Sequence, residues 1–132
     1  MRTRLVLVTL TLTLILIPSQ ALALTYHQAS HLTQATIQSM IRAEAHVEGY
    51  GPTQTAALVE LARRESNWHA TSRSSHGGFL GTFQLSRSMC MGHPWYHPTW
   101  NTRRAIRYIR YSSHHYGTPI RALAFWNTHH YY

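Results

Sequence analysis

Aspartate and lysine are both absent from this chain of 132 residues, so four glutamates and twelve arginines carry its formal charges. The net charge is +8 at pH 7 with histidine neutral, and a surface of that sign attracts polyanions. The shortage of carboxylates also limits the chemistry. A reaction that needs two paired carboxyl groups would have to draw both from Glu44, Glu48, Glu60 and Glu65.

Cysteine is almost absent as well. Cys90 is the single cysteine, so no disulfide can form within the chain, and packing has to hold the fold. A nucleophilic thiol would need a positioned base, and His93 is close in sequence. The flanking Met89 and Met91 favour a buried, unreactive thiol instead.

The eleven histidines do not form a metal motif. His114-His115 and His129-His130 are adjacent pairs, and neighbouring side chains on a helix diverge by about 100°. The chain has neither an H-E-x-x-H motif nor the Cys/His spacing of zinc sites. We therefore expect no metal ion and no cofactor.

Long hydrophobic runs are missing except near the start. Two arginines precede an apolar run over Leu5 to Ile17, and Ala21-Leu22-Ala23 follows it. This order is typical of a secretory signal peptide, with cleavage after Ala23. The alternative is an uncleaved membrane anchor, but the run is shorter than the roughly 20 residues that span a bilayer. We expect residues 1–23 to be the signal peptide and the rest to be secreted or associated with the cell wall.

The remaining sequence predicts a single, mostly helical domain with a short β or irregular element. Residues 24–36 show no clear periodicity and predict a loose leader. The other predicted elements are a helix over 36–48, a second from Pro52 to Trp68, a tight turn or short hairpin at Gly77-Gly78, a third helix over 101–115, and a last helix from Thr118-Pro119 to about 128. The expected division is residues 1–23, a leader and first helix over 24–53, and the main domain over 54–132.

Glu65 lies on the apolar side of the second predicted helix. Leu58, Leu61, Ala62, Glu65 and Trp68 follow the i, i+3, i+4, i+7 spacing of a buried stripe. Burial raises the pKa of a carboxyl group, and glycosidases obtain their general acid in this way. The alternative is a structural ion pair between Glu65 and an arginine such as Arg64.

Three short motifs around Glu65 resemble those of the soluble lytic transglycosylase family. In that family a Glu-Ser pair ends a helix, a Gly-x-x-Gly-x-x-Gln segment follows, and an Ala-Tyr-Asn motif lies near the end of the domain. The matching segments here are Glu65-Ser66, Gly78 to Gln84, and Ala124-Phe125-Trp126-Asn127.

The resemblance is closer to small secreted proteins of the actinobacterial type, with a transglycosylase or aggregation-promoting-factor-like C-terminal domain. It covers about residues 54–132. The residues that carry it are Arg64 to Trp68, Gly81 to Gln84, Trp95, Tyr108-Ile109, Tyr116 to Pro119 and Tyr131-Tyr132. The chain departs from the pattern at 99–102, which lacks the usual Pro-x-x-Gln, and at Tyr131, where the family has tryptophan.

The resemblance implies a lysozyme-like α+β fold, mainly helical, with Glu65 as the catalytic residue at the floor of a substrate cleft. It also implies that Ser66 orients the carboxyl group or touches substrate, and that Gln84 and Asn127 bind the glycan. Trp126 stands where the family has its motif tyrosine. The expected partner is peptidoglycan, with anionic wall polymers as further electrostatic contacts. We expect a monomer that does not bind nucleic acid.

The number of carboxylates favours one mechanism. Retaining and inverting glycosidases usually use two carboxyl groups. Glu60 is on the wrong face of its helix, which leaves only Glu44 or Glu48 as a second partner. A lytic transglycosylase needs one residue, which acts first as acid and then as base on a muramoyl hydroxyl. We therefore expect single-acid cleavage of the MurNAc–GlcNAc bond. The alternatives are a muramidase, a non-catalytic wall-binding or aggregation factor, and a membrane-active cationic protein.

Overall fold

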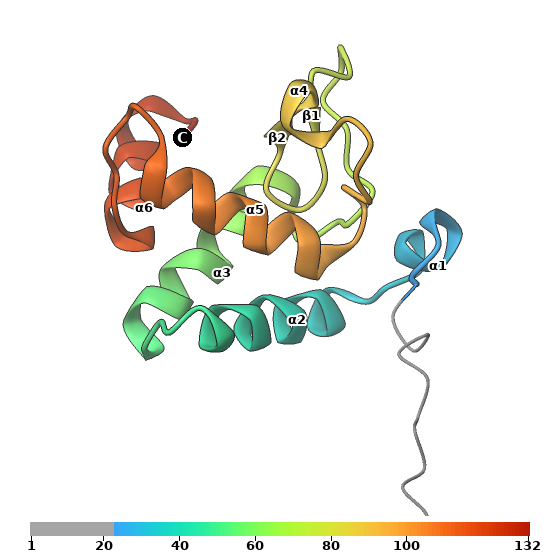
Figure 1. The fold of residues 1–132 in the computed structure, drawn as a ribbon, viewed down its shortest axis with the longest axis horizontal. Coiled ribbons are helices and arrows are strands. Elements are labelled where there is room, and N and C mark those ends of the chain that lie inside the picture. Colours follow the sequence, from blue (N-terminus) through green and yellow to red (C-terminus); the bar gives the residue numbers. More distant parts are fainter. Residues whose placement is uncertain (1–22) are drawn as a thin grey trace, which may run out of the picture.

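The computed structural model describes residues 23–132, so nearly all of the predicted signal peptide lies outside the described residues. The described chain is mainly helical with one two-stranded antiparallel sheet, as the sequence predicted (Figure 1). Its elements are α1 (Tyr26–Ser30), α2 (Gln34–Val47), α3 (Pro52–Ser66), β1 (Phe79–Leu80), β2 (Leu85–Ser86), α4 (Arg87–Cys90), α5 (Pro98–Tyr111) and α6 (Pro119–His129).

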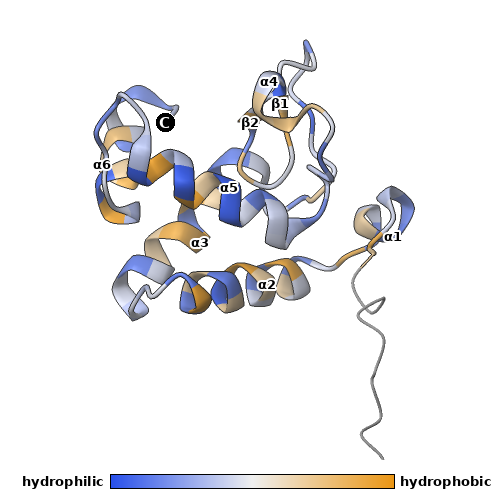
Figure 2. Cartoon of the chain, viewed as in Figure 1, coloured by the Kyte–Doolittle hydropathy of each residue, from blue (hydrophilic) through white to orange (hydrophobic). Residues whose placement is uncertain are grey.

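Four helices enclose the hydrophobic core. α3 packs against α6, and α2 packs against both α3 and α5. Figure 2 shows hydrophobic and hydrophilic residues alternating along α2 and α5, as expected for helices with one buried side. The largest fully buried apolar side chains are Phe83, Ile37, Ile41, Leu58, Leu61, Ile106 and Ile109. No helix among residues 23–132 is long and apolar enough to cross a membrane.

The loose leader predicted for residues 24–36 is wrong. Thr25 and Gln28 form a capping box at the start of α1, in which each side chain bonds the other residue's backbone N–H. Thr33 then caps α2, which begins at Gln34. Ala29 is buried against the core, to which α2 also contributes. The segment therefore packs as part of the domain, because caps rather than periodicity specify these short turns.

The predicted helix starts at prolines are confirmed, while two helix ends are not. α3 begins at Pro52, but it ends at Ser66 because Asn67 adopts a left-handed conformation. Trp68 therefore lies beyond the helix, and its indole N–H folds back to donate to the Val59 carbonyl at 2.9 Å. α5 begins earlier than predicted, at Pro98, and ends at Tyr111 because the next residue is extended. α6 follows its predicted Thr118 cap.

The tight turn predicted at Gly77-Gly78 is present, since the Gly77 N–H donates to the Ser74 carbonyl at 2.8 Å and Gly77 has a φ of +64°. The two-stranded hairpin follows it and has a turn of its own. β1 and β2 pair Phe79 with Ser86 and Leu80 with Leu85, and residues 81–84 connect them. The short helix α4 follows directly and was not predicted. The connecting turn is held from two sides, by Ser66 at the end of α3 and by Asn101 on α5.

Asn101 is fully buried beneath this turn. Its side-chain oxygen accepts a hydrogen bond from the Phe83 N–H at 2.8 Å, and its amide group donates to the Trp95 carbonyl at 3.0 Å. Gly81 lies directly against it with a φ of +81°. On the other side, the Ser66 hydroxyl donates to the Thr82 carbonyl at 2.7 Å. The turn that carries Gln84 is therefore fixed relative to α3, and so to Glu65.

Candidate active site around Glu65

Glu65 lines a hollow of about 230 Å³. Figure 1 shows the C-terminus lying between α6 and the hairpin, and residues of the C-terminal segment and of the hairpin form the walls. The lining residues are Glu65, Phe79, Gln84, His130, Tyr131 and Tyr132. Their side chains are three six-membered aromatic rings, one imidazole, one amide and one carboxyl group.

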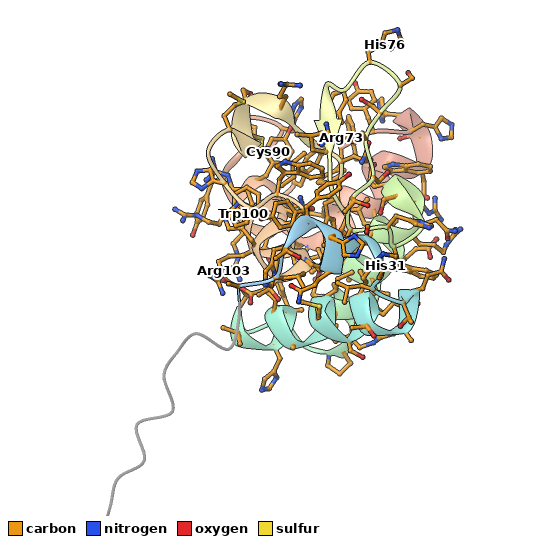
Figure 3. The ribbon with its side chains drawn as sticks, turned by 90° about the vertical axis from the view of Figure 1, so that its right-hand side faces the viewer. His31, Arg73, His76, Cys90, Trp100 and Arg103 are labelled. Atoms are coloured by element: carbon orange, nitrogen blue, oxygen red, sulfur yellow. The ribbon has the colours of Figure 1, made fainter. Side chains whose placement is uncertain are left out.

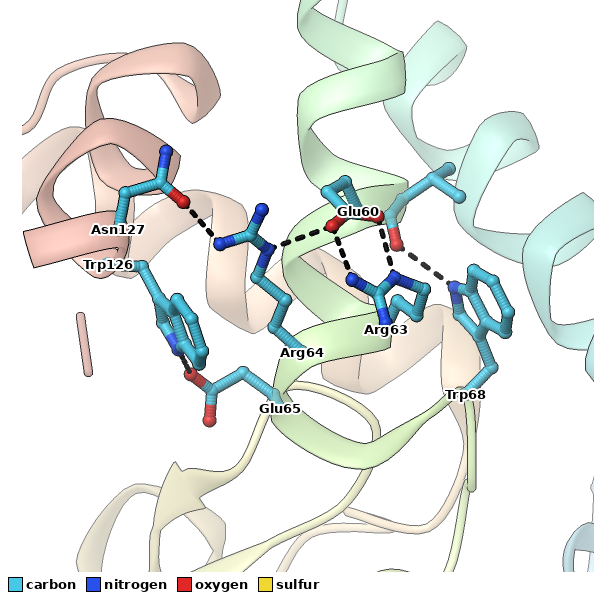
Figure 4. Close-up of polar contacts among 8 residues, drawn as sticks. Glu60, Arg63, Arg64, Glu65, Trp68, Trp126 and Asn127 are labelled. Carbon is cyan, nitrogen blue, oxygen red and sulfur yellow. Dashed lines mark hydrogen bonds and ion pairs between the residues drawn. The ribbon is translucent and has the colours of Figure 1, made fainter. Parts of the chain in front are cut away.

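The Glu65 carboxyl group is half-buried and has one polar side-chain partner. The indole Nε1 of Trp126 donates a hydrogen bond to its Oε1 at 2.5 Å (Figure 4). Burial raises the pKa of Glu65 to about 7, and the hydrogen bond from Trp126 offsets part of that rise. Near neutral pH the carboxyl group therefore exists in both its protonated and its ionised form, as a group that gives up and regains a proton must.

Arg64 does not pair with Glu65, although the sequence left that possibility open. Its Nε donates to Glu60 at 2.8 Å, and its terminal nitrogen donates to the side chain of Asn127 (Figure 4). Its guanidinium carbon also lies 4.9 Å from the centre of the Trp126 ring. Arg64 therefore packs against the Trp126 indole, which contacts Glu65, but does not itself bind the Glu65 carboxyl group.

The other three glutamates are all ion-paired. Glu44 binds Arg103 at 2.6 Å and Glu48 binds Arg110 at 2.8 Å. Glu60 binds both Arg63 and Arg64, each at 2.8 Å. Hydrogen bonds from Arg63 and then Arg64 hold the pKa of Glu60 at about 2, against the opposing effect of its partial burial. Glu65 alone among the four has no arginine partner within the described chain.

The structure brings three of the five predicted site residues together. Gln84 lines the same hollow as Glu65, with its amide nitrogen donating to the Gly81 carbonyl at 2.9 Å. Trp126 contacts Glu65 directly, as described above.

Ser66 and Asn127 are placed differently. Ser66 is buried, and its hydroxyl bonds the backbone of Thr82, so it holds the turn in place. Asn127 is exposed, accepts from Arg64 and does not line the hollow. Neither side chain has a hydrogen bond to Glu65.

Four of the six residues that line the hollow are not among the predicted site residues, namely Phe79, His130, Tyr131 and Tyr132. Phe79 occupies a variable position of the Gly78 to Gln84 motif, His130 belongs to no motif, and Tyr131 and Tyr132 form only the terminal pair of the resemblance. The Tyr132 hydroxyl donates to the Phe83 carbonyl at 3.0 Å, which ties the C-terminus to the hairpin turn. Burial and the nearby Glu65 carboxylate raise the pKa of Tyr132 well above its ordinary value, so the phenol remains a donor. Only the packing of the C-terminus onto the hairpin identifies these positions.

A comparison with protein-family models, curated proteins and solved structures gave no match to this chain. Within residues 23–132, no group of three or more histidine, cysteine or glutamate side chains is arranged to hold a metal ion. The hollow and the raised pKa of Glu65 are therefore the features that indicate a function.

Proposed function

We propose that this protein is a secreted lytic transglycosylase that cleaves the MurNAc–GlcNAc bond of peptidoglycan, with Glu65 as its single catalytic acid and base. The observation that carries the proposal is a half-buried carboxyl group with a pKa raised to about 7, in a hollow lined by no second glutamate side chain. A pKa near the working pH suits a residue that acts as acid and base in turn.

In the proposed first step, protonated Glu65 donates its proton to the bridging glycosidic oxygen. Oε1 is occupied by the Trp126 N–H, so the proton is donated from Oε2. The bond between the sugar carbon and the bridging oxygen then breaks, and the substrate's acetamido group stabilises the positive carbon. The hydrogen bond from Trp126 stabilises the carboxylate that is left behind.

In the second step, the Glu65 carboxylate removes the proton from the muramoyl C6 hydroxyl. The hydroxyl oxygen attacks the positive carbon of the same sugar and closes an anhydro ring. The proton returns to Glu65, so the residue ends in its starting state and no water is consumed. One carboxyl group therefore suffices for the whole reaction.

The walls of the hollow also suit a sugar chain. The Phe79 and Tyr131 side chains are about half exposed, at 51% and 55%. Exposed aromatic faces can stack against the apolar faces of sugar rings, and the Gln84 amide can bind a hydroxyl or acetamido group. Tyr26 and Tyr111 are also exposed, but neither lines this hollow.

A muramidase is the second candidate, and it would need another carboxyl group near Glu65. Glu44 is 3% exposed and tied to Arg103, and Glu48 is tied to Arg110. Neither residue lines the hollow. These positions support the single-acid reaction over the two-carboxylate one.

The test is digestion of purified peptidoglycan, with the masses of the released muropeptides as the readout. The wild type is compared with Glu65→Gln and with Glu48→Gln, a matched control that removes one carboxyl group outside the hollow. We expect anhydromuramoyl ends from the wild type and from Glu48→Gln, and none from Glu65→Gln. Circular dichroism confirms that all three proteins are folded.

Two other results would overturn the proposal. Ordinary reducing ends would identify a muramidase, and loss of activity in Glu44→Gln or Glu48→Gln would then identify the second carboxyl group. No release by the folded wild type, combined with sedimentation of the protein with intact peptidoglycan, would identify a non-catalytic wall-binding protein.

A further inference from the structure

A second and larger hollow lies on the opposite face of the hairpin from Glu65. Its volume is about 560 Å³. Successive residues of a β-strand point to opposite faces, and in β1 Phe79 lines the Glu65 hollow whereas Leu80 lines the larger one. Figure 3 labels two of its lining residues, Arg73 and Cys90, the latter at the end of α4. The hairpin therefore separates two distinct hollows.

The larger hollow is cationic and has no acidic residue in its wall. Arg73, Arg87 and His93 all line it. Each of the chain's other three glutamates is paired with arginines elsewhere, and Glu65 lines the opposite hollow. Within the described chain, no carboxylate therefore neutralises Arg73 or Arg87. The Cys90 thiol at the wall is 2% exposed, and burial raises its pKa, so the thiol is not a nucleophile here.

Arg73 is held in place without using its hydrogen-bond donors. Its guanidinium carbon lies 4.8 Å from the centre of the Trp95 ring and 5.8 Å from that of Tyr26. Its backbone forms a bridge with Leu80 of the hairpin. Stacking engages the flat face of a guanidinium group and leaves the N–H groups along its edge available. No described residue accepts a hydrogen bond from this side chain.

The aromatic side chains in the wall of this hollow are also held in place by their neighbours. Trp95 and Tyr96 pack edge to face at 5.8 Å, and Tyr26 of α1 packs against both, at 5.8 and 5.6 Å. The Trp95 carbonyl is bound by the buried Asn101. The rings are therefore fixed in position before any ligand arrives, which lowers the entropic cost of binding.

We propose that this hollow is a binding site for an anionic saccharide, a hexose-sized ring that carries a carboxylate or a phosphate. Arg73 and Arg87 bind the anionic oxygens, for which the planar guanidinium donor geometry is suited. Trp95 and Tyr96 supply the apolar surface against which a sugar ring packs. The volume is in the range of small-molecule sites, about 300–1,000 Å³. The site does not use Glu65 and is independent of the proposed cleavage reaction.

The test measures binding to the purified protein by isothermal titration calorimetry. The probes are glucose 6-phosphate, glucuronate, glucose and inorganic phosphate. We expect glucose 6-phosphate and glucuronate to bind, and the tighter of the two identifies the preferred anion. Glucose lacks the anionic group and inorganic phosphate lacks the sugar ring, so each should bind roughly tenfold more weakly or not at all. The Trp95 indole N–H signal should shift on titration in an NMR spectrum.

Variants that each lose one positive charge distinguish specific binding in this hollow from nonspecific electrostatic attraction to the protein. Arg73→Gln and Arg87→Gln should each weaken binding by roughly tenfold. Arg42→Gln removes the same charge from an exposed position outside the hollow and should leave binding unchanged. Thermal unfolding confirms that each variant is folded.

Three outcomes would overturn the inference: equal weakening by Arg42→Gln, inorganic phosphate binding as tightly as glucose 6-phosphate, or no binding of either anionic sugar by the folded wild type. Glu65→Gln should bind the sugars normally. Binding that persists in a protein without cleavage activity therefore distinguishes this site from the failure of the proposed reaction.

Discussion

The indole N–H of Trp126 donates to the Glu65 carboxylate at 2.5 Å across the contact between α3 and α6, although the two residues are 61 positions apart. This hydrogen bond acts against burial. Burial favours the protonated carboxyl group, whereas a donor favours the ionised one, and the balance leaves the pKa of Glu65 at about 7. The contact therefore determines the pH range in which Glu65 can act as an acid.

Replacing Trp126 with phenylalanine should move that range to higher pH. The substitution removes the donor, so the pKa of Glu65 rises further and the carboxyl group stays protonated to higher pH. We expect the alkaline limb of the kcat/KM profile on soluble peptidoglycan fragments to shift upward. Trp68→Phe is the matched control, since its indole N–H binds the Val59 carbonyl instead. An alkaline limb that stays in place in Trp126→Phe would contradict this assignment.

Glu65 should also make the protein less stable as pH rises. Its pKa is about 7 when folded, above the ordinary value of 4.5, so the folded state holds the proton more tightly. The stability gained from that proton is complete below pH 4.5 and is lost as pH rises through 7. Glu65→Gln should therefore unfold with a free energy about 2–3 kcal/mol higher than the wild type at pH 8, and nearly equal at pH 4.

Urea denaturation at both pH values measures this difference in unfolding free energy. Glu60→Gln is a control in which the unfolding free energy at pH 8 should change in the opposite direction. The pKa of Glu60 is lowered to about 2, so its ion pairs stabilise the fold above pH 4.5 and this contribution is lost as pH falls toward 2. Glu60→Gln should therefore be less stable than the wild type at pH 8. A Glu65→Gln variant with the same deficit at pH 8 would show that Glu65 is a structural carboxylate.

Ser66→Ala should lower stability and activity together. The substitution removes the 2.7 Å hydrogen bond to the Thr82 carbonyl and leaves a buried acceptor unpaired, at a cost of about 1–3 kcal/mol. The turn that carries Gln84 loosens as a result. Chemical denaturation and peptidoglycan digestion measure the two effects, with the exposed Ser113→Ala as control. Lost activity at unchanged stability would instead support the direct substrate contact that the family resemblance implies.

Gly81→Ala should lower the stability of the fold far more than Gly92→Ala. Both glycines have positive φ angles, +81° and +73°, so both substitutions carry a backbone strain of roughly 1–2 kcal/mol. A methyl group at 92 meets nothing within 4 Å, whereas one at 81 would lie 2.7 Å from the Trp95 carbonyl oxygen and closer still to the Asn101 amide. Thermal unfolding of the two variants should differ widely, and equal melting temperatures would contradict the close packing of this turn.

Features that depend only on neighbouring residues could be predicted before the fold was known. The helix starts at Pro52 and at Thr118-Pro119 follow from local backbone and capping preferences. The stripe that buries Leu58 and Leu61 and half-buries Glu65 follows from helical periodicity. The capping box of α1 is also encoded locally, but a helix of five residues is too short for periodicity to reveal.

Which helix faces meet, and therefore which partner each side chain contacts, depends on the packing of the whole domain. Trp126 reaches Glu65 while its neighbour Asn127 turns to Arg64, because consecutive residues of α6 point in different directions. Ser66 holds the hairpin turn, and the C-terminus closes one side of the Glu65 hollow. These contacts join segments far apart in the chain, and their geometry depends on the packing of whole helices, which no local pattern contains.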